Sequence, residues 1–317
     1  MNNFSRFTFN NQMETWNYRI WSNEFSGRSP DWRALRAAVF KHTVYIVNKQ
    51  EYITDTLDLI RIIPDPEMMK GSFLYKSPKH LKEASGRQKV KVTVMNADCL
   101  EAAKLLKSAG LNPAVLNMAN RHRPGGGVYG GAGAQEENLF RRSNLFLSLY
   151  QFSDLADKYG IARNQSNSYP LDRNTGGIYS PHVTVFRGTE HQGYCLLKYP
   201  YETAVISVPA INRPDHFKVD GEYRLSRSMQ ESTKEKIRTI LRIAGLHNHG
   251  SLVLSAFGCG AFRNPPGHMA ELFHQVFDED EFKYSFKTIV FTIISDHNTG
   301  KEHNPEGNLL PFLREFG

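Results

Sequence analysis

The feature that most constrains the fold is an alternation of strand-like and helix-like segments that begins at Val90 and continues through most of the remaining chain. Apolar runs with strand character lie at 90–96, 113–119, 182–187, 204–209, 251–257 and 287–295. Segments with apolar residues at helical spacing lie at 99–110, 137–152, 232–246 and 266–277. This alternation predicts a layered α/β domain with a parallel or mixed sheet.

Residues 1–80 have a different character. Trp32, Leu35, Val39 and Ile46 recur at roughly helical spacing, and a turn-rich stretch follows at 61–72. We therefore expect an N-terminal helical accessory or cap segment over 1–80 and a main α/β domain over 81–317.

The composition excludes several classes of protein. No apolar stretch approaches the roughly 20 residues of a membrane helix, and the first residues lack a secretion-signal pattern, so we expect a cytoplasmic protein. Cys99, Cys195 and Cys259 are far apart and form no CxxC pair, so neither a disulfide framework nor a zinc site is expected. No metal or cofactor is predicted. The formal charge of +7 favours anionic partners.

Glycines are concentrated at 125–133, where six occur in nine residues. Each costs conformational entropy on folding, so the cluster indicates unusual dihedrals or a close approach to a ligand. Gly125, Gly127 and Gly130 satisfy GxGxxG, but "NRHRP" separates the preceding strand from Gly125. No acidic residue ends a strand about 20 positions later, so a dinucleotide site of the Rossmann type is not expected.

A second glycine loop, "SAFGCGAFRNPP" at 255–266, also connects a predicted strand to a predicted helix. In an open α/β sheet, loops at the carboxyl ends of strands converge on one crevice. Backbone N–H groups of two such loops, aided by helix N-termini, suit a diphosphate. The alternative for each loop alone is a tight structural turn.

Two adjacent carboxylates, Glu136 and Glu137, follow the first loop. Adjacent helix positions do not share a face, so the two should have different roles. Glycosidases with paired carboxylates separate them by about 5 Å or more across the scissile bond, which neighbours cannot easily do. One glutamate alone can serve as acid and then as base. The alternative is that both only complement the dipole of the helix they begin.

The stretch "RPGGGVYGGAGAQEENL" resembles the GGG, spacer, QEE signature of poly(ADP-ribose) glycohydrolases of the bacterial type. Further similar blocks occur in the same order, including "VLNMANRHRPGGG", "YPLDRNTGGIYSPHVTVFR", "LSAFGCGAFRNPP" and "VFTIISDHN". The resemblance covers about residues 30–298. It implies a macrodomain-like three-layer α/β/α sandwich with a mixed sheet that binds ADP-ribose, and hydrolysis of ribose–ribose O-glycosidic bonds, at terminal units.

The resemblance also implies roles for individual residues. Glu137 would be the catalytic acid, with Glu136 and Gln135 orienting the hydroxyls of the ribose that is cleaved. The expected substrate-binding residues are Asn120 at that ribose, Gly125, Gly126, Gly127, Gly258, Cys259, Gly260 and Ala261 at the diphosphate, Phe262 at the distal ribose and Asp98 at the adenine. Met118 and Ser255 depart from the family pattern, which has an aromatic residue and a glycine there.

The expected partners are ADP-ribose, poly(ADP-ribose) and ADP-ribosylated macromolecules, with no membrane and with nucleic acid only as a modified substrate. Two alternatives stay open. One is a hydrolase of the same fold that removes single ADP-ribose groups from protein or nucleic acid. The other is a non-catalytic macrodomain that only binds ADP-ribose.

Overall fold

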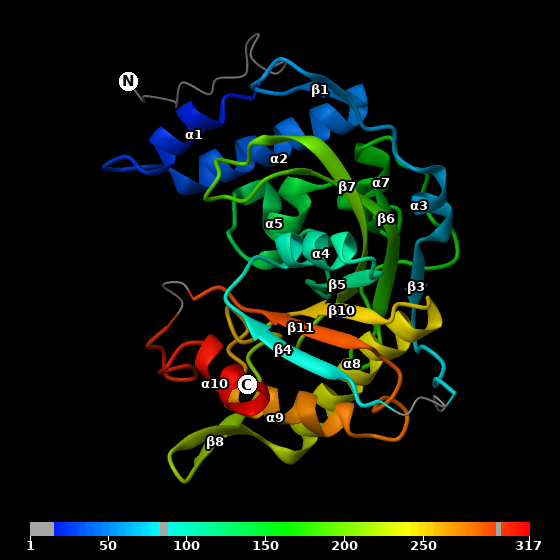
Figure 1. Cartoon of the computed structure of the whole chain (residues 1–317), viewed down its shortest axis with the longest axis vertical. Coiled ribbons are helices and arrows are strands. Elements are labelled where there is room, and N and C mark those ends of the chain that lie inside the picture. Colours follow the sequence, from blue (N-terminus) through cyan, green and yellow to red (C-terminus); the bar gives the residue numbers. More distant parts are fainter. Residues whose placement is uncertain (1–15, 83–87, 296–298) are drawn as a thin grey trace. The chain divides into compact units, whose positions relative to one another are not determined.

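The computed structural model describes residues 16–82, 88–295 and 299–317 (Figure 1). Residues 1–15 of the predicted accessory segment and the last three residues of the block "VFTIISDHN" lie outside this part of the chain. The chain divides into two compact units. The first unit contains residues 1–71, 124–163 and 182–202, and the second contains 72–123, 164–181 and 203–317.

The second unit is built on strands of a seven-stranded sheet with the order β3-β6-β7-β5-β10-β11-β4. Its short strands are β3 (Phe73–Tyr75), β4 (Lys91–Met95), β5 (Pro113–Met118), β10 (Ser251–Leu254) and β11 (Thr288–Thr292). The long strands β6 (Gly177–Arg187) and β7 (Leu196–Val208) each continue into the first unit. β3 pairs antiparallel with β6, whereas β7, β5, β10, β11 and β4 pair in parallel, so the sheet is mixed.

Helices cover both faces of the parallel strands. α4 (Cys99–Ser108) contacts β5, β10 and β11, and Figure 1 shows α9 (Pro266–Phe277) and α10 (Leu309–Phe316) on the opposite side of these strands. The side chains of α8 (Arg227–Leu246) and α9 form one buried cluster with alternate residues of the strands, such as Leu252 and Leu254. A β8–β9 hairpin (His216–Val219 and Glu222–Leu225) precedes α8. The second unit therefore has the predicted α/β/α layering.

The first unit contains α1 (Tyr18–Phe25), α2 (Trp32–Lys49), the β1–β2 hairpin (Glu51–Ile53 and Leu59–Arg61) and α3 (Pro66–Gly71). The glycine loop follows, with the short 3₁₀ helix η1 (Val128–Gly130) inside it, and then α5 (Gln135–Arg142), α6 (Leu145–Tyr150) and α7 (Leu155–Lys158). α2 packs against both η1 and α5. The N-terminal helices thus belong to the same compact unit as the glutamates, and a cap function for residues 1–80 stays a prediction.

One predicted element differs from the structure. The helix expected over 137–152 is divided into α5 and α6, because Ser143 is extended and forms an antiparallel bridge to Val185. The Asn144 side chain accepts the Thr184 N–H at 2.8 Å, which holds the interruption in place. Among the described residues, no helix is long and apolar enough to cross a membrane.

Candidate active site

The two glutamates lie in the first turn of α5, inside the first unit. The helix begins after Ala134, which is extended and provides no side-chain cap, so acidic residues in the first turn complement the helix dipole. Glu136 and Glu137 are nevertheless only 4% and 7% exposed. Carboxylates are rarely buried without compensating hydrogen bonds, so their partners define what they can do.

The partners include backbone N–H groups of the first glycine loop. Gly125 donates to Glu136 Oε1 at 3.0 Å, and Gly127 donates to Glu137 Oε1 at 2.8 Å. These two N–H groups therefore bind carboxylates in this structure, and the expected contact of Gly125 and Gly127 with a diphosphate stays a prediction. The N–H of Gly126 has no acceptor among the described residues, so its contact with a diphosphate stays a prediction.

The second oxygen of Glu137 has a different environment from the first. Oε2 is buried and has no hydrogen-bond partner within the described part of the chain. A buried oxygen without a partner carries a desolvation cost of about 1–3 kcal/mol, which a ligand or a proton can relieve. The two oxygens of Glu137 thus differ, and the role of this carboxyl group as the catalytic acid stays a prediction.

Gly126 is required by the geometry around both carboxylates. Its φ is +52°, and a Cβ at this position would lie 2.5 Å from Glu137 Oε1 and 3.1 Å from Glu136 Oε2. Nearby, Gly131 has a φ of +67°, and a Cβ there would overlap the carbonyl oxygen of Arg33 in α2. The glycine loop therefore fits between α2 and the start of α5 only because it lacks side chains at these points.

A buried polar network ties this loop to the rest of the first unit. Arg141 Nη1 donates to the Ala132 carbonyl at 2.8 Å, and its Nε donates to the Tyr194 hydroxyl at 2.9 Å. Tyr194 donates to Glu190, which also forms a two-bond ion pair with Arg36 of α2. Burial raises the pKa of Glu190, but the hydrogen bonds and charge of Arg36 outweigh it and hold the pKa below its usual value.

The second glycine loop lies in the second unit and follows β10. Gly258 has a φ of +75°, and its carbonyl accepts Asn264 Nδ2 at 3.1 Å. The same Asn264 amide donates to the Ile211 carbonyl at 2.8 Å. The N–H groups of Gly260, Ala261 and Phe262 have no acceptor within the described residues, so this loop presents a row of available donors.

Cys259 contributes backbone rather than thiol chemistry. Its carbonyl is bonded to His303 Nε2 at 2.9 Å, and burial raises the pKa of the thiol. A buried, protonated thiol is a poor nucleophile.

Asn120 and Asp98 both follow strands of the second unit. Asn120 Oδ1 accepts the N–H groups of His122 and Arg123, at 2.9 and 3.0 Å, which fixes the turn after β5. Asp98 caps α4 by accepting the N–H groups of Leu100 and Glu101, so a structural role is visible for it. Its contact with adenine stays a prediction.

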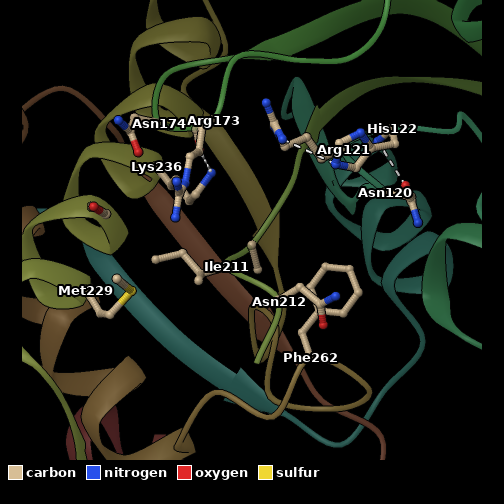
Figure 2. Close-up of a pocket in the computed structure, with 12 residues that line it drawn as sticks. Asn120, Arg121, His122, Arg173, Asn174, Ile211, Asn212, Met229, Lys236 and Phe262 are labelled. Atoms are coloured by element: carbon tan, nitrogen blue, oxygen red, sulfur yellow. Dashed lines mark hydrogen bonds between the residues drawn. The ribbon is translucent and has the colours of Figure 1, made fainter. Parts of the chain in front are cut away.

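The structure thus groups the predicted residues in two sets. The first unit holds Gly125, Gly126, Gly127, Gln135, Glu136 and Glu137, and the second holds Asp98, Asn120 and the loop 258–262. Within the second unit, Asn120 and Phe262 line one pocket, and Asp98 does not line it (Figure 2). Sequence reasoning missed the supporting residues Arg141 and Asn264, although Asn264 stands in the quoted loop motif.

One group in the described chain has the composition of a metal site. Ligand atoms of Asp65, His182 and Glu202 lie within 4.8 Å of one another in the first unit. None of the three is a predicted site residue, and such surface groups commonly form ion pairs, as His182 does with Glu202 at 3.0 Å.

The family relationship is supported by sequence and by structure. A family model described as microbial-type PARG, catalytic domain, matches residues 41–188. A comparison with curated protein sequences gives no match. The poly(ADP-ribose) glycohydrolase (PARG) of Thermomonospora curvata is similar, with a TM-score of 0.71 and 29% identity, over 90% of this chain and 100% of that chain.

Two solved complexes are also similar. The Thermomonospora curvata protein bound to the inhibitor ADP-HPD has a TM-score of 0.69 and 30% identity, with the same coverage. The glycohydrolase of Deinococcus radiodurans in complex with ADP-ribose has a TM-score of 0.60 and 28% identity, over 81% of this chain and 98% of that chain. These likenesses confirm the predicted macrodomain-like α/β fold. This chain belongs to the microbial-type poly(ADP-ribose) glycohydrolases, a family of glycosidases.

Proposed function

We propose that this chain hydrolyses the ribose–ribose O-glycosidic bond of poly(ADP-ribose), at terminal units, and releases ADP-ribose. The observation that carries the proposal is the environment of Glu137, whose Oε1 accepts the Gly127 N–H while its buried Oε2 has no partner among the described residues. A carboxyl group held in this way has one defined oxygen for proton exchange. The family membership supplies the substrate class.

In the proposed reaction, Glu137 Oε2 carries the proton and donates it to the glycosidic oxygen as the bond to the ribose C1″ breaks. The electron pair of that bond leaves with the oxygen, and positive charge develops on the ribose. The carboxylate then accepts a proton from water as the water oxygen bonds to C1″, which restores the acid. Glu136, held by Gly125, would orient ribose hydroxyls rather than transfer the proton.

The second loop would bind the diphosphate of the terminal unit. The N–H groups of Gly260, Ala261 and Phe262 have no acceptor in the described chain, which is the arrangement that an anion requires. Asn120 would contact the ribose that is cleaved. ADP-ribosylated protein or nucleic acid would share the ADP-ribose half of this substrate, so the linkage must be tested directly.

The decisive experiment compares the wild type with Glu137→Gln on three substrates, namely poly(ADP-ribose), mono-ADP-ribosylated protein and ADP-ribosylated DNA. We expect the wild type to release ADP-ribose from the polymer. Glu137→Gln should lose roughly 10²- to 10⁴-fold in rate while binding ADP-ribose with unchanged affinity. Glu136→Gln is the matched control, and it should lose less.

Two results would overturn the proposal. If the wild type bound ADP-ribose without hydrolysing any of the three substrates, the chain would be a binding module. If it acted only on a modified protein or DNA, the ribose–ribose linkage would be the wrong substrate.

A further inference from the structure

The second unit contains a cavity of about 310 Å³ in which only two lining residues, Asn120 and Phe262, have a predicted role (Figure 2). Asn120 and Arg121 lie on one side of it, and Arg173 and Lys236 lie on the other. Ile211, Met229 and Phe262 provide the apolar part of the lining. A cavity of this size is at the lower end of the range for small-molecule sites.

The charge of this cavity, which we call the basic pocket, is one-sided. Its lining residues include Arg121, Arg173 and Lys236 and no Asp or Glu. Lys236 is only 3% exposed, and its Nζ donates to the Arg173 carbonyl at 2.6 Å. Asp172 does not line the pocket, but its negative charge partly offsets the positive charge of Lys236. The Asp172 carboxylate also accepts the N–H groups of Asn174 and Thr175.

The lysine is held in an unfavourable environment. The pKa of Lys236 is lowered to about 8, mainly by burial and also by the charges of Arg121 and Arg173, against the opposing effect of Asp172. Burying an ammonium group beside two guanidinium groups costs free energy. An anion in the pocket would relieve this cost by charge-assisted hydrogen bonds to all three side chains.

The remaining lining identifies the class of anion. Side-chain amides of Asn120, Asn174 and Asn212 can bond hydroxyl groups or base edges, and the Ile211 and Met229 side chains offer an apolar wall. Cationic, amide and apolar surfaces together suit a nucleotide better than an inorganic ion. By the family resemblance Asn120 contacts the ribose that is cleaved, so a ligand of this pocket would adjoin that ribose.

We propose that the basic pocket binds the adenosine and diphosphate of the neighbouring ADP-ribose unit, the one that leaves when the glycosidic bond breaks. The inference rests on the proposed function, because only a polymer has such a unit. The second glycine loop already provides donors for the diphosphate of the terminal unit, so the two anion sites would serve two successive units of the chain.

The test uses Arg173→Gln and Lys236→Met in the full chain, with Lys107→Gln as the matched control. Arg173 is exposed and its loss should leave the fold intact, whereas Met retains the apolar stem of Lys236. Lys107 is exposed on α4 and does not line the pocket. KM and kcat are measured on poly(ADP-ribose), and the affinity for free ADP-ribose is measured by calorimetry.

We expect each pocket variant to raise KM for the polymer by about tenfold, as the loss of one charge-assisted contact implies. The affinity for free ADP-ribose and the kcat should stay at the wild-type values, and Lys107→Gln should behave as wild type. Unchanged KM in folded Arg173→Gln and Lys236→Met proteins would overturn the inference. So would an equal loss of ADP-ribose affinity, since the pocket would then belong to the terminal unit.

A binding titration separates this inference from the proposed function. In a Glu137→Gln background, an oligomer of two ADP-ribose units should bind more tightly than ADP-ribose, and the pocket variants should abolish the difference. If the wild type failed to hydrolyse polymer but this difference persisted, the function would be wrong and the pocket assignment right. A loss of affinity confined to ADP-ribosylated DNA would instead assign the pocket to a nucleic-acid strand.

Discussion

The loop over 125–134 and the loop over 255–264 both follow a buried strand and both contain glycines with positive φ, yet their backbone N–H groups have different partners. In the first loop, Gly125 and Gly127 donate to Glu136 and Glu137 of the same unit. In the second, the N–H groups at 260–262 have no acceptor among the described residues. Under the proposed function, the difference implies that the two glycine-rich loops have different tasks, the positioning of an acid in one and the binding of an anion in the other.

The strongest challenge to this comparison is Gly126→Ala. A Cβ 2.5 Å from Glu137 Oε1 must displace the carboxylate, and the φ of +52° adds backbone strain. Displacement of a reacting group by about 1 Å can cost about 100-fold, so we expect kcat on poly(ADP-ribose) to fall by that order. If the first loop positions the acid and does not bind the diphosphate, calorimetry should show ADP-ribose affinity within about threefold of wild type, a change of less than about 1 kcal/mol in binding free energy. A variant that lost affinity but kept kcat would show that the first loop is the anion site.

The converse substitution is Gly258→Ala in the second loop. A Cβ there would lie 2.5 Å from Asn264 Nδ2 and 2.6 Å from Ala210 Cβ, so the loop must shift away from both. We expect the ADP-ribose dissociation constant to rise about tenfold, which corresponds to about 1.4 kcal/mol, with kcat at saturating substrate much less affected. Thermal unfolding provides the control for a general loss of structure. A fall in kcat with unchanged ADP-ribose affinity would show that the second loop does not differ from the first in its task.

The support of the first loop can be tested with Tyr194→Phe. The hydroxyl accepts from Arg141 and donates to Glu190, so its removal leaves a buried guanidinium nitrogen without that partner. We expect a loss of about 1 kcal/mol in the free energy of unfolding and a smaller fall in kcat than for Gly126→Ala. Urea unfolding measures the first quantity. Tyr199→Phe, at a side chain that is 75% exposed, is the matched control and should be neutral.

In the unit that carries the second loop, we expect one buried histidine, His268, to make the free energy of unfolding depend on pH in mild acid. His268 Nδ1 accepts the Leu225 N–H at 2.8 Å, and burial lowers its pKa from 6.5 to about 4. The folded state therefore binds fewer protons than the unfolded state between these values, and stability is lost as the pH falls through that window. Between pH 7 and pH 6 we expect His268 to contribute a loss of about 0.7 kcal/mol. His268→Gln should remove that part of the pH dependence in urea unfolding, and an unchanged slope would contradict the assignment.

The smallest expected effect is that of metal removal. Neither loop offers a cluster of metal ligands, and the proposed chemistry uses one carboxyl group and water. Exhaustive chelation should leave hydrolysis of poly(ADP-ribose) unchanged, including in an Asp65→Asn variant of the surface group at Asp65, His182 and Glu202. Loss of turnover that a divalent ion restores would end the carboxylate-only mechanism.

Much of the second unit could be predicted from the sequence, because its strands and helices follow local hydrophobic periodicity. The segments predicted at 90–96, 99–110 and 113–119 correspond to β4, α4 and β5, and Gly110, with a φ of +76°, follows the end of α4. The division between α5 and α6 could not be predicted in this way. It depends on the antiparallel bridge between Ser143 and Val185, two residues that are far apart in the sequence, so local hydrophobic periodicity does not indicate it.

The candidate site shows the same limit. Glu136, Glu137 and the glycines were identified from a contiguous motif, but which N–H group meets which carboxylate depends on the turn between them. Lys236 lies in an amphipathic segment, and from the sequence a lysine at this position is expected to be exposed to solvent. Its burial depends on the Arg173 carbonyl, 63 residues away, so the basic pocket could not be inferred before the fold was known.

The composition of the first unit has a consequence for how the protein is made. Its three segments end at residues 71, 163 and 202, so α2 is synthesised long before Arg141 and Tyr194 exist to complete its packing. The apolar face of α2 lacks its packing partners η1 and α5 until these have been synthesised, and the nascent chain is exposed to aggregation during that interval. The helix that carries the glutamates is thus synthesised before Tyr194 and Glu190, the residues that complete the hydrogen-bond network around Arg141.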